Sequence, residues 1–158
     1  MELTGYGIRA DLPSGWEGTI ALDRDPDSIE LVGIGASLQP VAHLASFALP
    51  SDRGDFGSGA VDVMSRDDVF VALVEFAPEE AGAALFAQEG LPRRLDPRAF
   101  SERSLQRGLP GQAGLQVFFH EAGRAFCLYV VLGDADDAHR LVRDVEQVLA
   151  TLTIEARR

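Results

Sequence analysis

The sequence predicts a single α+β domain spanning residues 1–158, in which an antiparallel β-sheet is flanked by helices and closed by a long C-terminal helix. Hydrophobic residues alternate with polar ones over the first 22 residues, residues 69–76 are apolar on both faces, and a helical stripe follows Gly133. Strands come first and the longest helix last, which is typical of an α+β domain rather than repeated βαβ units. With 158 residues and 46% hydrophobic content, the chain can bury one core without a disulfide.

The first half of the chain predicts four short strands. Tyr6–Leu12 and Trp16–Leu22 both alternate, and Pro13–Gly15 between them is typical of a turn, so we predict a β-hairpin. Ile29–Leu49 is apolar but broken by glycines and a proline, which favours two strands, the second at Val41–Leu49. The glycine-rich residues that follow predict a loop.

The middle of the chain predicts a buried strand and a short helix. Val69–Phe76 is rich in β-formers on both faces, as in a central strand that is covered on both sides. Pro78 and the two acidic residues after it indicate a helix start, with the helix running to about Gln88. Residues 91–108 are rich in arginine and proline, and predict an extended segment that leads to a strand near Ser104–Arg107.

The last third predicts a hairpin and then a helix. Leu115–His120 and Arg124–Leu132 flank Glu121–Gly123, where glycine supplies the positive φ that a tight turn needs. Asp134 or Asp136 can cap the following helix. Seven apolar residues of that helix recur at spacings of three and four and form one stripe: Ala138, Leu141, Val142, Val145, Val148, Leu149 and Leu152.

Two of these segments carry a family resemblance. Residues 6–16, which end in Pro-Ser-Gly-Trp, and residues 124–132, which are followed directly by the helix, resemble the opening and closing units of the Mog1/PsbP-like group, including its DcrB-type bacterial members. The resemblance spans nearly the whole chain and implies an α/β/α sandwich. It also implies a protein-binding role, because members of the group mostly bind other proteins: a small GTPase, photosystem subunits or secreted effectors. It implies no catalytic residues.

Charge and composition limit the classes of partner. With 25 acidic against 14 basic residues the net charge is -11, which argues against nucleic-acid binding because phosphate contacts need cations. All 14 basic residues are arginine, a bias typical of GC-rich bacterial genomes. Neither a secretory leader near Met1 nor a membrane span is predicted. We therefore expect a cytoplasmic protein, and an exported mature form whose leader was removed stays open.

The reactive residue types predict no catalytic residue, metal site or cofactor. The chain has no Gly-x-Ser-x-Gly motif, and Cys127 lies in an apolar strand where a buried, inert thiol is expected. His43, His120 and His139 lie far apart without the spacing of a zinc site. Gly33–Leu38 begins like a dinucleotide-binding loop but lacks its third glycine, so we predict no nucleotide there.

A concentration of arginines is the feature that most suggests a binding surface. Five of them fall within fifteen residues of an acidic protein: Arg93, Arg94, Arg98, Arg103 and Arg107. They could contact an acidic partner surface, or pair with nearby acids of the same chain. The leading hypothesis is a non-catalytic protein-binding module, adaptor-like or chaperone-like. The alternatives are a small-ligand-binding protein or enzyme with a pocket between sheet and helix, and a structural homo-oligomer such as a homodimer joined through an exposed strand.

Overall fold

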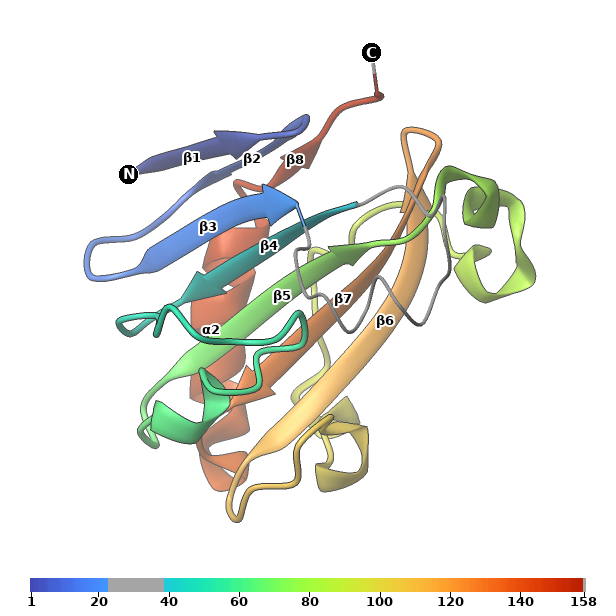
Figure 1. Ribbon diagram of the computed structural model, residues 1–158. Coiled ribbons are helices and arrows are strands. Elements are labelled where there is room, and N and C mark those ends of the chain that lie inside the picture. The colour runs from blue at the N-terminus through green and yellow to red at the C-terminus, as the bar shows by residue number, and fades with distance from the viewer. Residues whose placement is uncertain (23–38, 158) are drawn as a thin grey trace.

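Two antiparallel sheets make up most of the computed structural model, which describes residues 1–22 and 39–157 (Figure 1). The larger sheet has five strands in the order β3 (Glu17–Leu22), β4 (Pro40–Ala45), β5 (Val69–Glu75), β7 (Arg124–Leu132) and β6 (Ala113–Glu121). The smaller sheet has three, in the order β1 (Glu2–Gly5), β2 (Ile8–Asp11) and β8 (Thr153–Ile154). It lies beyond β3, at the top of Figure 1.

The predicted α+β class, an antiparallel sheet flanked by helices, is wrong: the fold is mostly β. Within the residues that the structure describes, α2 (Ala138–Leu149) is the one α-helix, and it covers one face of the five-stranded sheet (Figure 1). The same described residues also contain six short 3-10 segments: Val61–Val63, Pro78–Gly82, Ala84–Phe86, Pro97–Ala99, Glu102–Ser104 and Ala135–Asp137. The helix expected from Pro78 to about Gln88 does not form, and two of these 3-10 segments, Pro78–Gly82 and Ala84–Phe86, take its place. This stretch lacks an apolar stripe that could pack a regular helix.

The five-stranded sheet separates two hydrophobic clusters. Val69, Val71 and Leu73 of β5 face the cluster that includes α2, while Phe70, Ala72 and Val74 face the other side. All seven residues of β5 are buried, which confirms the prediction of a central strand. A helix was expected to cover the second face, but there partly buried side chains from loops pack against the sheet: Phe47, Leu49, Phe56, Met64, Leu105 and Leu109.

The two predicted N-terminal strands correspond to β2 and β3, but β1 was not predicted and the predicted pairing is wrong. β2 pairs with β1 and β8, whereas β3 pairs with β4, so the expected hairpin of residues 6–12 with 16–22 does not form. Alternation identifies a strand without identifying its partner. Both edges of β2 are occupied, and the turn at residues 13–15 therefore carries the chain from one sheet to the other.

Other predicted boundaries shift or fail. The strand expected at Val41–Leu49 ends at Ala45, and the strand expected near Ser104–Arg107 is replaced by a 3-10 turn at Glu102–Ser104. The first of the two strands predicted within 29–49, together with the Gly33–Leu38 motif, lies outside the described residues.

The C-terminal hairpin and helix confirm their predictions. β6 and β7 pair over their full length, and Ala122 and Gly123 between them have φ of 55° and 74°, as a type I′ turn requires. Five residues of the predicted stripe on α2 are fully buried within its bounds: Leu141, Val142, Val145, Val148 and Leu149. The predicted cap differs: Asp134 caps the 3-10 segment Ala135–Asp137 by accepting from the Asp136 backbone N–H, whereas α2 itself begins after Asp137, whose side chain makes no capping hydrogen bond.

A buried histidine fastens the loop that covers the second face. His43 of β4 accepts at Nδ1 from Arg53 Nε (2.8 Å), so its Nε2 carries the proton and donates to the Asp55 carbonyl (2.7 Å). Arg53 also donates to the Pro50 carbonyl and the Thr19 hydroxyl. Burial lowers the pKa of His43 from 6.5 to about 4, against the opposing effect of the Asp55 hydrogen bond and with a smaller contribution from the Arg53 charge.

This histidine predicts a loss of stability on acidification. Its pKa is lower in the folded chain than in the unfolded one, so the unfolded chain binds more protons between pH 6.5 and 4. The stabilisation is complete above pH 6.5 and lost as pH falls through about 4, at a cost of about 3 kcal/mol. Urea denaturation of wild type and His43→Gln across this window measures it. Equal losses in the two proteins would contradict the assignment, because other titrating groups are common to both.

Candidate functional site: a cleft at the junction of the two sheets

A hollow of about 440 Å³ lies where the tip of the small sheet meets the ends of strands of the large one. We call it the junction cleft. Its walls come from the β1–β2 turn, the end of β3, the start of β4, the start of β7 and the segment after β8: Tyr6, Gly7, Leu22, Pro40, Arg124 and Glu155–Arg157.

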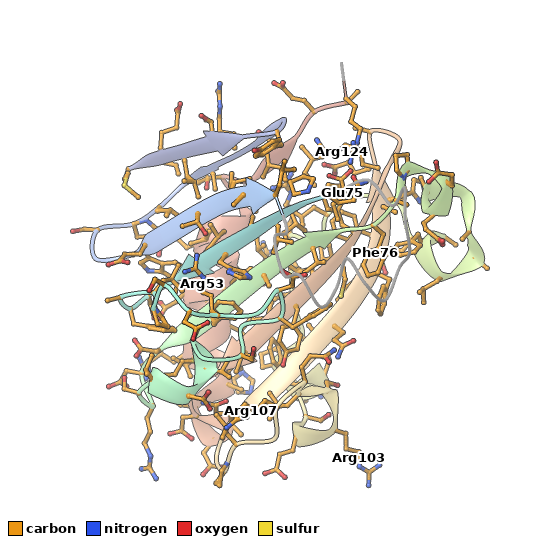
Figure 2. All side chains as sticks on the ribbon, in the orientation of Figure 1. Arg53, Glu75, Phe76, Arg103, Arg107 and Arg124 are labelled. Atoms are coloured by element: carbon orange, nitrogen blue, oxygen red, sulfur yellow. The ribbon has the colours of Figure 1, made fainter. Side chains whose placement is uncertain are left out.

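The wall of the junction cleft contains a buried ion pair. Arg124 is 2% exposed and donates to the Glu75 carboxylate twice, through Nε (3.1 Å) and Nη2 (2.6 Å). Its Nη1 donates to the Glu155 carbonyl (2.8 Å), and its guanidinium carbon lies 5.2 Å from the centre of the Phe126 ring. Figure 2 shows Arg124 and Glu75 facing each other near the end of the large sheet that borders the small one.

Removing two charges from water is costly, and only good geometry and further hydrogen bonds offset the cost. Both conditions hold here, because the pair is bidentate and a backbone carbonyl takes a further Arg124 hydrogen. The register of β5 and β7 brings Glu75 and Arg124 close together. Glu75, the last residue of β5, is opposite Phe126, which follows Arg124 by two residues at the start of β7. The ion pair therefore fixes the Arg124 guanidinium in one orientation.

A second guanidinium reaches the same carboxylate from the solvent side. Arg157 donates to Glu75 Oε2 from Nε (3.2 Å) and Nη2 (2.7 Å), and Nη2 also donates to the Gln39 side chain. The Glu75 side chain is 0% exposed, whereas that of Arg157 is 42% exposed. Two guanidiniums thus share one buried carboxylate, and the guanidinium of Arg157 is the one on the solvent side, in the lining of the junction cleft.

The β1–β2 turn at the rim of the junction cleft holds a residue in an unfavourable conformation. Tyr6 and Gly7 have φ of 53° and 78°, the pattern of a type I′ turn, which favours asparagine, aspartate or glycine at both positions. Gly7 is required, because a Cβ there would lie 2.8 Å from Arg124 Nη1. Tyr6 is not required by the turn, yet its side chain is placed at the rim and 51% exposed. Strain of this kind collects at functional sites.

The arginines singled out in the sequence do not gather into one patch. Arg93 donates to the carbonyls of Leu149 and Leu152 at the C-terminal end of α2. Arg98 is exposed and pairs with Asp96, two residues before it (3.4 Å), and the Arg98 backbone N–H is the main cause that lowers the pKa of the Asp96 carboxyl.

The remaining arginines of that set are exposed. Arg107 pairs with Asp62 at 2.6 Å, while Arg94 and Arg103 make no ion pair with any residue in the described ranges. Arg103 and Arg107 lie at the opposite end of the molecule from Arg124 (Figure 2). That Arg93, Arg94, Arg98, Arg103 and Arg107 contact a protein partner stays a prediction, and such a partner would meet them as separate contacts.

The other reactive residues are held in structural contacts. Cys127 is 0% exposed, and burial raises the pKa of its thiol to about 12. His120 Nδ1 lies 2.6 Å from the Phe86 carbonyl, and the His120 backbone bonds to Gln88 and Gly90. Over residues 1–22 and 39–157, no group of three or more His, Cys, Asp or Glu is arranged to hold a metal ion.

Comparison with known proteins leaves the site to be judged on its geometry. No protein-family model, curated protein or solved structure matches this chain. The Mog1/PsbP-like resemblance therefore stays a prediction, while the helix-flanked sandwich it implies is not the fold observed. No helix in the described part of the chain is long and apolar enough to cross a membrane.

The buried ion pair predicts a large asymmetry between two charge-removing substitutions. Glu75→Gln leaves Arg124 buried without its counter-charge and is expected to lower the free energy of unfolding by about 3–5 kcal/mol. Arg107→Gln breaks the exposed pair with Asp62 and is expected to cost less than about 1 kcal/mol. Urea denaturation measures both. Similar losses in the two variants would show that the buried Glu75 pair matters no more for stability than the exposed Arg107 pair.

The two type I′ turns predict matched gains in stability. Asparagine tolerates positive φ better than tyrosine or alanine, so Tyr6→Asn and Ala122→Asn should each raise the free energy of unfolding by about 1 kcal/mol. Ala122 lies in the β6–β7 turn and serves as the control. If Tyr6→Asn is destabilising while Ala122→Asn is stabilising, the tyrosine is retained for packing rather than for the junction cleft.

Proposed function

We propose that this chain is a non-catalytic binding module whose binding site is the junction cleft. One observation carries the proposal: a guanidinium that is itself buried and held by a bidentate carboxylate opens onto a hollow of about 440 Å³. Sites for small molecules have volumes of about 300–1,000 Å³, with a few fixed polar groups among apolar walls. Arg124 is such a fixed group, and Leu22, Pro40 and Ala156 are such walls.

The side chains of the junction cleft are suited to holding a ligand rather than to transforming it. Arginine stays protonated at all ordinary pH values and so cannot exchange a proton with a substrate. The Glu75 carboxylate, which could act as a base elsewhere, accepts from two guanidiniums and lies behind them. His43, His120 and Cys127 are engaged in packing and hydrogen bonds away from the cleft lining.

The edge of β6 is poorly suited to pairing two copies of the chain. β6 is an outer strand of the large sheet, but the Gly114 backbone is bonded to Ser101 and the His120 backbone to Gln88 and Gly90. Both ends of that edge are thus occupied by the same chain, which is how proteins blunt edges against self-association. Binding to a second protein through the exposed arginines remains the alternative proposal.

The proposal predicts where small molecules bind. Amide signals in a ¹⁵N–¹H NMR spectrum, recorded with a library of small organic compounds, should shift at Gly7, Leu22, Ala156 and Arg157. Tyr6→Asn should weaken the binding of compounds found in this way by about fivefold, from loss of ring contact. Ala122→Asn should leave binding unchanged. Shifts confined to other surfaces, or an absence of shifts, would refute the junction cleft as the site.

A further inference from the structure

We infer that the junction cleft takes the carboxylate of a small organic acid with an apolar body. The inference rests on the proposed function and adds the chemical class of the ligand. It follows from the charges on the cleft walls, the hydrogen atoms that the two arginines leave unused, and the apolar surface beside them.

The Arg157 guanidinium places a cation at the wall of the junction cleft. Arg124 and Arg157 both donate to the one carboxylate of Glu75, whose side chain is 0% exposed. The buried carboxylate neutralises one of the two guanidiniums, so these three groups leave one positive charge, on the side of the half-exposed Arg157. With the exposed Glu155 side chain of the lining, the four charges sum to zero, so any preference for an anion comes from direct contact with Arg157. Glu155 also borders the cleft. It holds Arg124 through its backbone carbonyl, and its exposed carboxylate forms no ion pair within the described ranges.

The unused donors belong to the arginine nearest solvent. A guanidinium has five N–H hydrogens. Arg157 uses Nε and Nη2 on Glu75 and Gln39, and its Nη1 makes no bond to the residues that the structure describes. An incoming carboxylate can therefore accept from Arg157 Nη1 without breaking the contact with Glu75. Hydrogen bonds between two ionised groups are about twice as strong as those between neutral groups.

Much of the rest of the cleft wall is apolar and suits the hydrocarbon part of a ligand. Leu22, Pro40 and Ala156 present apolar atoms, and the half-exposed ring of Tyr6 stands at the rim. An aromatic ring offers a large contact area at little cost in conformational entropy. The energetically unfavourable backbone of Tyr6 is accounted for if its ring covers the apolar part of the ligand.

Three probes of nearly equal shape test the charge. Phenylacetate, phenylacetamide and phenethylamine carry a negative, a neutral and a positive group on the same benzyl body. The expected order of affinity, measured by NMR shifts at Gly7, Ala156 and Arg157, places phenylacetate at least about tenfold above the amide, with the amine weakest. Raising the salt concentration should reduce this preference, because the Arg157 side chain is partly exposed.

A matched pair of variants assigns the preference to one arginine. Arg157→Gln should lower phenylacetate affinity at least about tenfold and remove the preference over the amide. Arg66→Gln removes the same charge from an exposed loop position and should leave both unchanged. Each variant's spectrum reports whether the fold is retained, which is expected for Arg157→Gln because Arg124 still pairs with Glu75.

The outcomes separate this inference from the proposed function. If the amide or the amine binds in the junction cleft as tightly as phenylacetate, the cleft is a binding site but not one for carboxylates. If phenylacetate keeps its affinity in Arg157→Gln, the arginine is not the receptor of the negative charge. If none of the three probes shifts the cleft signals, both the carboxylate inference and the proposed site fall.

Discussion

The bidentate contact between Arg124 and Glu75 is the constraint on which the junction of the two sheets depends. It joins the end of β5 to the start of β7, and through the Glu155 carbonyl it also holds the segment after β8. Gly7 must lack a side chain so that the small sheet can approach this guanidinium. A buried pair of this kind adds little to stability compared with an apolar pair, but losing one partner is severe. The pair instead holds the Arg124 guanidinium in a fixed position beside the junction cleft.

Two residues around this constraint contribute little to the fold itself. Tyr6 occupies a turn position that asparagine would fill at lower conformational cost, and Arg157 adds a second cation to a carboxylate that already has one. Each is understandable as part of a surface that binds something, since sites of function are where local rules of stability are broken. By contrast, His43 has a pKa that burial lowers to about 4, yet its hydrogen bonds with Arg53 and Asp55 serve to hold a loop on the sheet.

Local sequence patterns predict the elements that are determined by residues close to one another in the sequence. The stripe of α2, the fully apolar β5 and the glycine turn between β6 and β7 are all predictable, because periodicity and turn chemistry act over a few residues. The two-residue β8, the pairing of β2 and the loops over the second face depend on contacts between distant segments. The same holds for the site, since Glu75 and Arg124 are 49 positions apart. One signal was available: Glu75 is the one charged residue within the apolar run 69–76.

Arginines that are close in the sequence do not lie close together in the structure, and two that are distant in the sequence do. The five between residues 93 and 107 are distributed from one end of α2 to the far end of the molecule, whereas Arg124 and Arg157 stand far apart in sequence and meet at one carboxylate. The protein as a whole carries a charge of -11, which repels an approaching anion at long range. Salt screens such fields beyond about 8 Å, so attraction is left to groups that contact the ligand directly. A local cation whose position is fixed in advance is one way in which an acidic protein can bind an acid.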